Sequence, residues 1–158
     1  MNLYLLRHGI AQEAYQWDGS DSARPLTGEG QTKTRAVLKA LRKKHAIELD
    51  AIWTSPYVRA KQTAAIAAEV LEAPVLECPP LAVGASVEAV ASFMKKHPAP
   101  ERLMLVGHEP SMGEMLGDLS GEGAQPMKKA GCAHLSGTFK HGKMKLHWHL
   151  RPKDLLGD

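Results

Sequence analysis

The chain has few aromatic residues, only two cysteines and no long hydrophobic run. Aromatic side chains make up 5% of its 158 residues, so aliphatic residues must fill the core, which favours helices packed on a sheet over an all-β sandwich. Cys78 and Cys132 lie far apart and match no C-x-x-C spacing, so neither a disulfide framework nor a zinc site is indicated. We expect both thiols to lie in the core or near the surface.

Apolar segments are too short to cross a membrane. No segment reaches the ~18 consecutive apolar residues that a spanning helix needs, and residues 1–7 meet a charge too early for a secretory signal. We therefore expect a cytoplasmic protein with no membrane partner. The length predicts one domain over residues 1–158.

The net charge is small but unevenly distributed along the chain. The formal net charge is +3, yet from Pro126 onward seven basic residues stand against two acidic ones. Such an end could attract an acidic protein or a nucleic acid. Proteins that bind single-stranded nucleic acid have aromatic residues interleaved with their basic residues, and these lysines lack that pattern. We therefore interpret the basic end as a solvated strand face and tail, and we do not expect a nucleic-acid partner.

The hydrophobic pattern predicts strands that alternate with helices. Strands are expected at residues 2–6, 49–54 and 103–106, with an extended segment at 74–81. Helices are expected at 28–45 after the cap Thr27, from Ser55-Pro56 to 71, at 87–96 after the cap Ser86, and at 109–119. The remaining segments are expected to be loops at 10–25 and 121–129 and a β-hairpin over 132–139 and 143–150. This order predicts an α/β fold of three layers, with a mainly parallel sheet, helices on both faces and a C-terminal β-hairpin.

Histidines and arginines follow the predicted strands. Ligands of such sheets bind beyond the carboxyl ends of the strands. Arg7-His8 follows the first strand, Ser55 and Arg59 follow the second, and His108 follows the strand at 103–106. A pocket of two histidines and two arginines suits a phosphoryl group and needs no metal, because guanidinium groups match phosphate oxygens. One histidine can act as a nucleophile, and the other can stabilise charge in the transition state.

Four segments together resemble a known family. They are residues 6–11 (LRHGIA), 24–27 (RPLT), 55–64 (SPYVRAKQTA) and 106–110 (VGHEP). In order and spacing they are similar to the signatures of the histidine phosphatase superfamily, whose fold is phosphoglycerate mutase-like. The chain has little room for the helical insertions of the longer members, and in length and pattern it resembles the short SixA-type phosphohistidine phosphatases.

The resemblance implies roles for individual residues. His8 would be the phosphorylated nucleophile, and Arg7, Arg59 and His108 would complete the phosphate pocket, where phosphate or sulfate is expected to bind. Arg24 would line the same cavity from its loop. The backbone carbonyl of Gly9 would accept the other ring proton of His8 and thereby fix the reactive tautomer. No cofactor and no metal are implied.

One family element, a carboxylic acid that protonates the leaving group, has no clear counterpart. Glu77 and Glu88 are the possible proton donors before His108, and Glu109 lies beside it. We expect Glu88 to be an ordinary exposed helix residue and Glu109 a charge at a helix start. An imidazole leaves far more easily than an alkoxide, so the missing acid favours phosphohistidine as the substrate.

The last predicted strand carries two further histidines. His147 and His149 are expected on one face, with Trp148, Leu146 and Leu150 on the other, core-facing side. Two histidines could bind a metal, but no third ligand is evident. We interpret their face as solvated.

The sequence thus predicts a hydrolase of signal transduction that removes phosphate from phosphohistidine on a protein, without a metal. The phosphorylated partner could be a histidine phosphotransfer domain or a carrier. Two alternatives stay open. One is a broader phosphomonoesterase for small molecules, and the other is a module that binds phosphoproteins without catalysis.

Overall fold

A computed structural model describes residues 1–157 of the chain. Its six strands form one sheet in the order β3-β2-β4-β1-β5-β6. The first four of these are parallel, whereas β5 runs antiparallel to β1 and β6 antiparallel to β5. The strands are β1 (Asn2–Arg7), β2 (Ala51–Thr54), β3 (Val75–Glu77), β4 (Arg102–Gly107), β5 (Cys132–Gly137) and β6 (Met144–Leu150). The predicted mainly parallel sheet with a C-terminal hairpin is confirmed.

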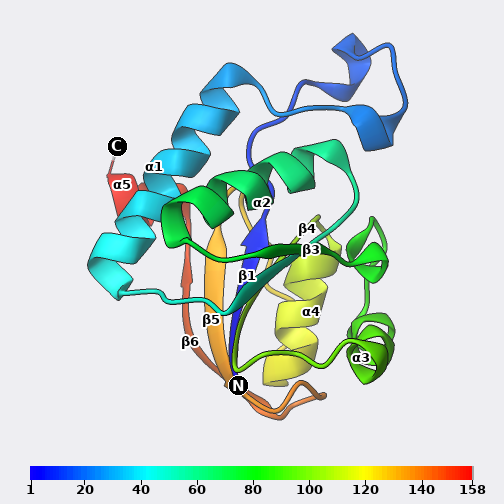
Figure 1. The fold of residues 1–158 in the computed structure, drawn as a ribbon, viewed down its shortest axis with the longest axis vertical. Helices are drawn as coiled ribbons and strands as arrows, with labels where there is room; N and C mark the ends of the chain where they lie inside the picture. Colours follow the sequence, from blue (N-terminus) through cyan, green and yellow to red (C-terminus); the bar gives the residue numbers. More distant parts are fainter. Residues whose placement is uncertain (158) are drawn as a thin grey trace.

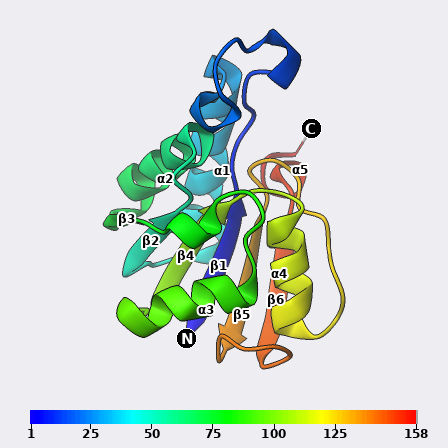
Figure 2. The ribbon, with the colours of Figure 1, turned by 90° about the vertical axis from the view of Figure 1, so that its right-hand side faces the viewer.

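Helices cover both faces of the sheet (Figures 1 and 2). On one face lie α1 (Gly28–His45), α2 (Val58–Leu71) and α5 (Pro152–Leu156), and on the other lie α3 (Val87–Lys96) and α4 (Ser111–Ser120). The central strand β1 serves both cores, because Leu3 and Leu5 face one hydrophobic cluster while Tyr4 and Leu6 face the other. The three-layer prediction is therefore correct.

Side-chain caps set the start of two helices as expected. The Thr27 hydroxyl accepts a hydrogen bond from Gly30 N–H at 2.9 Å, and the Ser86 hydroxyl accepts one from Ala89 N–H at 3.2 Å. The expected start of α2 at Ser55-Pro56 is wrong by two residues. Tyr57 is the N-cap of that helix, and the Ser55 hydroxyl accepts from Tyr57 N–H outside it.

Several other boundaries differ from the prediction. The segment at 74–81 forms only the short strand β3 and a 3-10 turn at Pro79–Leu81, because proline cannot continue a ladder of hydrogen bonds. The helix α4 begins at Ser111 rather than at residue 109. The loop 10–25 contains two 3-10 turns, Ala14–Gln16 and Asp21–Ala23. The short helix α5 was not predicted.

An irregularity in the hairpin corrects the face assignments in β6. The register of β5 with β6 shifts between His134 and Leu135, which reverses the alternation of inward side chains. Leu146 consequently packs against the cluster of α3 and α4, whereas Trp148 and Leu150 pack against the cluster of α1 and α2.

The two histidines of β6 have separate partners. His147 Nε2 lies 2.6 Å from the Ser136 hydroxyl, while His149 Nδ1 lies 3.3 Å from the Gln125 side-chain oxygen. Over residues 1–157, no group of three or more His, Cys, Asp or Glu side chains is arranged to hold a metal ion. Both cysteines are buried and free, as expected.

Within the same described range, no helix has the length and apolar character to span a membrane.

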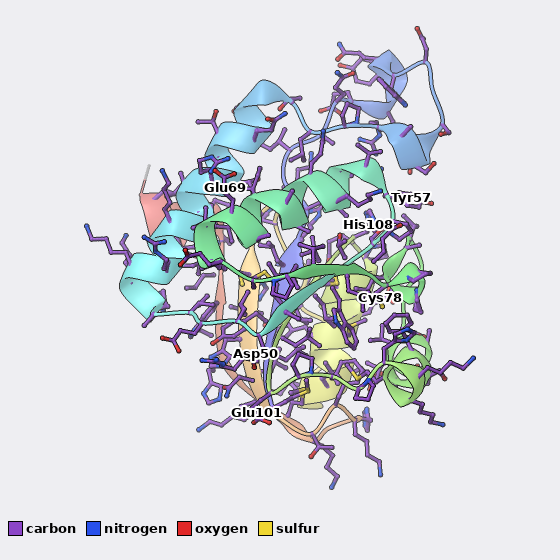
Figure 3. All side chains as sticks on the ribbon, in the orientation of Figure 1. Asp50, Tyr57, Glu69, Cys78, Glu101 and His108 are labelled. Atoms are coloured by element: carbon purple, nitrogen blue, oxygen red, sulfur yellow. The ribbon has the colours of Figure 1, made fainter. Side chains whose placement is uncertain are left out.

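Strand pairing brings three segments together at the carboxyl edge of the sheet. Arg7 pairs with Gly107, and His8 N–H donates to the Gly107 carbonyl at 3.0 Å. Ser55 N–H donates to the Val106 carbonyl, also at 3.0 Å. His108 and Tyr57 lie at this end of the molecule, and Asp50 and Glu101 lie at the opposite end (Figure 3).

Candidate active site

A cavity of about 350 Å³ lies at the carboxyl edge of the sheet. Its lining includes all five cationic or imidazole side chains expected there, namely Arg7, His8, Arg24, Arg59 and His108. The loop 10–25 extends over this end of the sheet (Figure 1) and contributes Arg24. The structure therefore brings together residues that lie up to about a hundred positions apart in the sequence.

His8 is buried, with only 6% of its surface exposed. Its Nδ1 lies 2.7 Å from the backbone carbonyl of Gly9. A carbonyl only accepts hydrogen bonds, so Nδ1 carries the ring proton and Nε2 keeps its lone pair. Arg59 Nε donates weakly to that Nε2 at 3.4 Å. The contact expected between His8 and the Gly9 carbonyl is confirmed.

Gly9 contacts His8 through its carbonyl and is held by α2 through its N–H. Its N–H donates to the Thr63 hydroxyl at 3.0 Å, and that hydroxyl donates to the Arg59 carbonyl at 2.8 Å. A Cβ atom at Gly9 would overlap with the Thr34 hydroxyl. The helix α2 thereby holds Gly9, the residue whose carbonyl orients His8, and Thr63 is a positioning residue that the sequence analysis missed.

His108 is 2% exposed and its ring centroid lies 5.2 Å from that of His8. Its Nε2 lies 2.8 Å from the Ser55 hydroxyl, which already accepts from Tyr57 N–H. When that hydroxyl donates its own proton to Nε2, the proton of the imidazole lies on Nδ1. Nδ1 is buried and has no partner in the described part of the chain. In that tautomer His108 offers an unused donor at the cavity.

Arg7, at the end of β1, and Arg59, in the first turn of α2, have different environments in this cavity. Arg7 donates from Nη1 to the Met127 carbonyl at 2.9 Å, while its buried Nε has no partner within residues 1–157. Arg59 is 4% exposed and lies over the Tyr57 ring, 5.1 Å from its centroid. Both guanidinium groups are held by neighbouring atoms before any ligand arrives.

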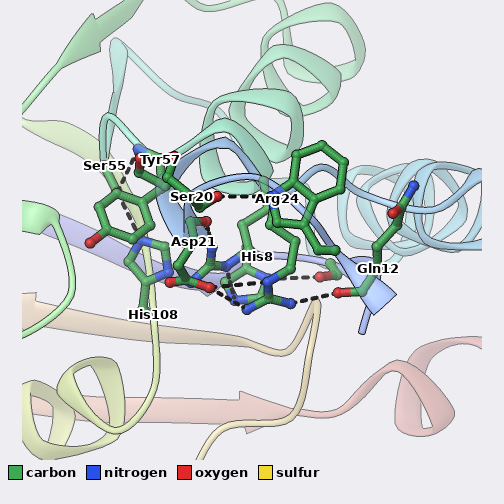
Figure 4. A network of polar contacts seen from close by, with 12 residues as sticks. His8, Gln12, Ser20, Asp21, Arg24, Ser55, Tyr57 and His108 are labelled. Carbon is green, nitrogen blue, oxygen red and sulfur yellow. Dashed lines mark hydrogen bonds and ion pairs between the residues drawn. The ribbon is translucent and has the colours of Figure 1, made fainter. Parts of the chain in front are cut away.

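Asp21 is a residue of the cavity that the sequence analysis did not identify (Figure 4). Its carboxylate bridges two arginines, at 3.0 Å from Arg24 Nη2 and 3.2 Å from Arg59 Nη2, and its carbonyl accepts from Arg59 Nη1 at 2.8 Å. Arg24 is held further by the Gln12 carbonyl at 2.7 Å. The available signal was the position of Asp21, three residues before Arg24 in the same polar loop.

The two carboxylates expected as possible proton donors do not line the cavity. Glu77 is exposed on β3, with its carboxylate 3.9 Å from Lys61 Nζ, and Glu88 is exposed in the first turn of α3. The possible role of both as proton donors is therefore wrong, because β3 lies at the edge of the sheet and Glu88 is exposed, whereas the expectation that Glu88 is an ordinary exposed helix residue is confirmed. Glu109 does line the cavity, and its carboxylate accepts from Gly113 N–H at 2.7 Å, as expected at a helix start.

Burial keeps the two histidines neutral. Burial is the largest cause that lowers the pKa of His8 to about 3; the nearby His108 and Arg59 act in the same direction, and the hydrogen bond to the Gly9 carbonyl acts against them. Burial, followed by the charge of Arg59, lowers the pKa of His108 to about 4. Burial alone would raise the pKa of Asp21, but hydrogen bonds from Arg24 and Arg59 bring it below its ordinary value. At neutral pH both imidazoles of the cavity are therefore neutral, and Asp21 is ionised between its two arginines.

Replacing His8 by glutamine is expected to reduce the loss of stability in acid. The unfolded chain protonates His8 near its ordinary pKa of 6.5, but the folded chain does so only near 3. The neutral, buried His8 therefore contributes fully to the free energy of unfolding above pH 6.5. That contribution is lost as the pH falls toward 3, and about 2 kcal/mol of it is lost at pH 5. Denaturant unfolding at pH 7 and pH 5 measures this loss in the wild type and in His8→Gln. An equal loss of unfolding free energy in both proteins would contradict the buried neutral state of His8.

Removing the charge of Asp21 is expected to tighten phosphate binding. An anion that binds Arg24 and Arg59 must displace the Asp21 carboxylate, and exposed ion pairs of this kind contribute about 0.2–1 kcal/mol. Asp21→Asn should therefore lower the Kd for inorganic phosphate by about two- to fivefold in isothermal calorimetry. The matched control is Asp18→Asn, an exposed position of the same loop outside the cavity lining. An equal effect in both variants would assign the change to net charge.

Comparison with known proteins agrees with this geometry. Residues 3–82 match the family model of the histidine phosphatase superfamily (branch 1). An uncharacterized protein of Picosynechococcus sp. is 38% identical over 121 residues, which cover 72% of this chain and 70% of that protein. The phosphohistidine phosphatase SixA of Escherichia coli is 24% identical over 98% of this chain and 96% of its own.

A solved structure has the same fold over nearly its whole length. The protein histidine phosphatase SixA complexed with tungstate superposes with a TM-score of 0.81 at 26% identity, over 98% of this chain and 99% of that one. The chain belongs to the histidine phosphatase superfamily (branch 1), in which it is a phosphatase that resembles the short SixA-type members.

Proposed function

We propose that this phosphatase removes the phosphoryl group from phosphohistidine on a protein, through an intermediate phosphorylated on His8. The observation that carries the proposal is the orientation of His8. Its Nδ1 donates to the Gly9 carbonyl at 2.7 Å, and its unprotonated Nε2 is at the cationic cavity. An imidazole in this state is ready to attack phosphorus without first losing a proton.

The reaction has two displacement steps at phosphorus. In the first, the lone pair of His8 Nε2 forms a bond to phosphorus as the phosphorus–nitrogen bond of the substrate breaks, and the leaving imidazole takes up a proton from solvent. In the second, a water oxygen attacks the phosphorus, the bond to Nε2 breaks, and inorganic phosphate leaves while the water proton passes to solvent. His8 returns to its neutral form.

Unused donors of the site would hold the phosphoryl oxygens. The Nε of Arg7 is a buried donor without a partner within residues 1–157, and so is the Nδ1 of His108 in the tautomer whose Nε2 accepts from Ser55. Arg59 lies beside Nε2 of His8, and Arg24 approaches from the loop. These groups are already in place before charge develops in the transition state, which is the condition for electrostatic stabilisation. They also supply the positive charge that a metal ion would otherwise bring.

The carboxylates around the cavity favour a leaving group that needs little protonation. Asp21 is held ionised by two arginines, and the Glu109 carboxylate is engaged with Gly113 N–H. An imidazole, whose conjugate acid has a pKa of ~6.5, departs near neutral pH, whereas an alkoxide needs an acid. The Escherichia coli relative is a phosphohistidine phosphatase, which supports the same substrate.

A broader phosphomonoesterase is the second candidate. The observation that favours it is Glu13, an exposed carboxylate that also lines the cavity and could protonate an alkoxide. The two functions differ in the leaving group and can be separated by experiment.

Phosphoramidate is expected to label His8. Incubation should add the mass of one phosphoryl group in an acid-labile form, because a phosphorylated imidazole is unstable in acid. His8→Ala should lose the label and lower kcat by a factor on the order of 10⁴ or more, with circular dichroism unchanged. Activity should persist in EDTA. Phosphate binding without label or turnover would instead indicate a module that binds without catalysis.

Phosphohistidine is expected to be a better substrate than phosphate esters. We expect kcat/KM for a phosphohistidine peptide to exceed that for phosphoserine in the same peptide by about a hundredfold or more, because general acid catalysis contributes about 10²–10⁴-fold for a poor leaving group. Glu13→Gln serves as the control variant and should leave both rates unchanged. Faster turnover of the ester, with a loss in Glu13→Gln, would support the phosphomonoesterase.

A further inference from the structure

A second cavity borders the catalytic cavity and is strongly basic. Its volume is about 690 Å³, and Arg7 and Lys129 line both cavities. Among the described residues of the lining, only Ile10 and Pro152 carry no positive charge. We call this cavity the basic cleft. Its cationic lining residues are Arg7, Lys33, Lys128, Lys129, Arg151 and Lys153.

One wall of the basic cleft is hydrogen-bonded to the backbone of the candidate nucleophile, His8, and of its neighbour Arg7. Ala130 N–H donates to the carbonyls of both Arg7 and His8 at 3.1 Å, and Arg7 N–H donates to the Gly131 carbonyl at 3.1 Å. Arg7 also donates from its side chain to the Met127 carbonyl. Hydrogen bonds therefore join the turn that carries Lys128 and Lys129 to the backbone of Arg7 and His8.

The remaining wall of the basic cleft comes from α1 and α5. Leu155 of α5 belongs to the same hydrophobic cluster as Val37 and Leu41 of α1, and Lys44 donates to the Leu155 carbonyl. This packing brings Lys33 and Lys153 into one lining although they lie far apart in the sequence. Both lysines are exposed.

The charge of the basic cleft is poorly compensated. Arg151 forms an ion pair with Asp154 at 2.9 Å. In contrast, Lys33, Lys128, Lys129 and Lys153 have no carboxylate within 4.0 Å in the described chain, and none of the described carboxylates lines the cleft. Neighbouring ammonium groups repel one another, so this arrangement stabilises a complex with an acidic partner more than it stabilises the free protein.

We propose that the basic cleft is a docking surface for an acidic face of the phosphorylated protein substrate. This inference rests on the proposed function and extends it from the phosphohistidine to the surface around it. Exposed lysines produce a diffuse positive field, which steers an acidic surface toward the site and raises the rate of association more than the rate of chemistry. The described lining has no aromatic side chain on which the bases of a nucleic acid would stack.

Two synthetic phosphohistidine peptides test the proposal. They have the same length and carry either three glutamates or three lysines on each side of the phosphohistidine. Free phosphohistidine serves as the substrate without flanking charge. At low salt, the wild type should hydrolyse the glutamate peptide with a kcat/KM at least about tenfold above that for the lysine peptide. This preference should fall toward unity near 0.5 M salt, where screening acts within a few ångströms.

Charge-reversal variants test whether the preference for the glutamate peptide arises in the basic cleft. The variant Lys33→Glu/Lys128→Glu/Lys153→Glu should lose the preference for the glutamate peptide through a higher KM at unchanged kcat, and it should hydrolyse free phosphohistidine as fast as the wild type. The matched control Lys39→Glu/Lys43→Glu/Lys145→Glu changes the net charge equally at exposed positions that line neither cavity. It should keep most of the preference.

The outcomes separate this inference from the proposed function. Equal rates on both peptides, or equal losses in the two triple variants, would overturn the docking surface and leave phosphohistidine hydrolysis intact. Failure of the wild type on every phosphohistidine substrate would overturn both. Tighter binding of a single-stranded oligonucleotide than of the glutamate peptide, abolished by the cleft variant alone, would assign the basic cleft to a nucleic acid instead.

Discussion

Parallel pairing of β1 with β4 is the constraint on which the site depends. In this register Arg7 lies opposite Gly107, so the residue that follows each strand is a histidine and the two imidazoles lie 5.2 Å apart. A shift by one residue would turn one histidine to the opposite face of the sheet. Both cores reinforce the register, because β1 is buried on both faces.

Burial and hydrogen bonding together make His8 reactive. Removal from water keeps the imidazole neutral, and the positive field of the nearby arginines favours the same neutral form. The Gly9 carbonyl then selects which nitrogen retains its lone pair. The same positive field attracts a phosphoryl group, so the site combines a neutral nucleophile with cationic binding groups. Asp21 balances part of this charge and is the internal anion with which a ligand competes.

The basic C-terminal part of the chain was expected to be a solvated strand face and tail, but most of its basic residues line the basic cleft. Lys145 is exposed on the hairpin, in line with a solvated strand face. Lys128, Lys129, Arg151 and Lys153, however, line a cleft that shares Arg7 with the catalytic cavity. Composition records how many charges are present, whereas their effect on a partner depends on which of them face the same space.

The sequence by itself determined the alternation of strands and helices, the caps at Thr27 and Ser86, and the residues that follow each strand, because periodicity and capping are local properties. It also identified the segments that carry His8, Arg59 and His108. Only the tertiary structure decided that Asp21 joins two arginines, that Glu77 and Glu88 lie outside the cavity, and that the register shift separates Leu146 from Trp148. Those outcomes depend on contacts between distant segments, and their free energies are set by packing and burial that no local pattern encodes.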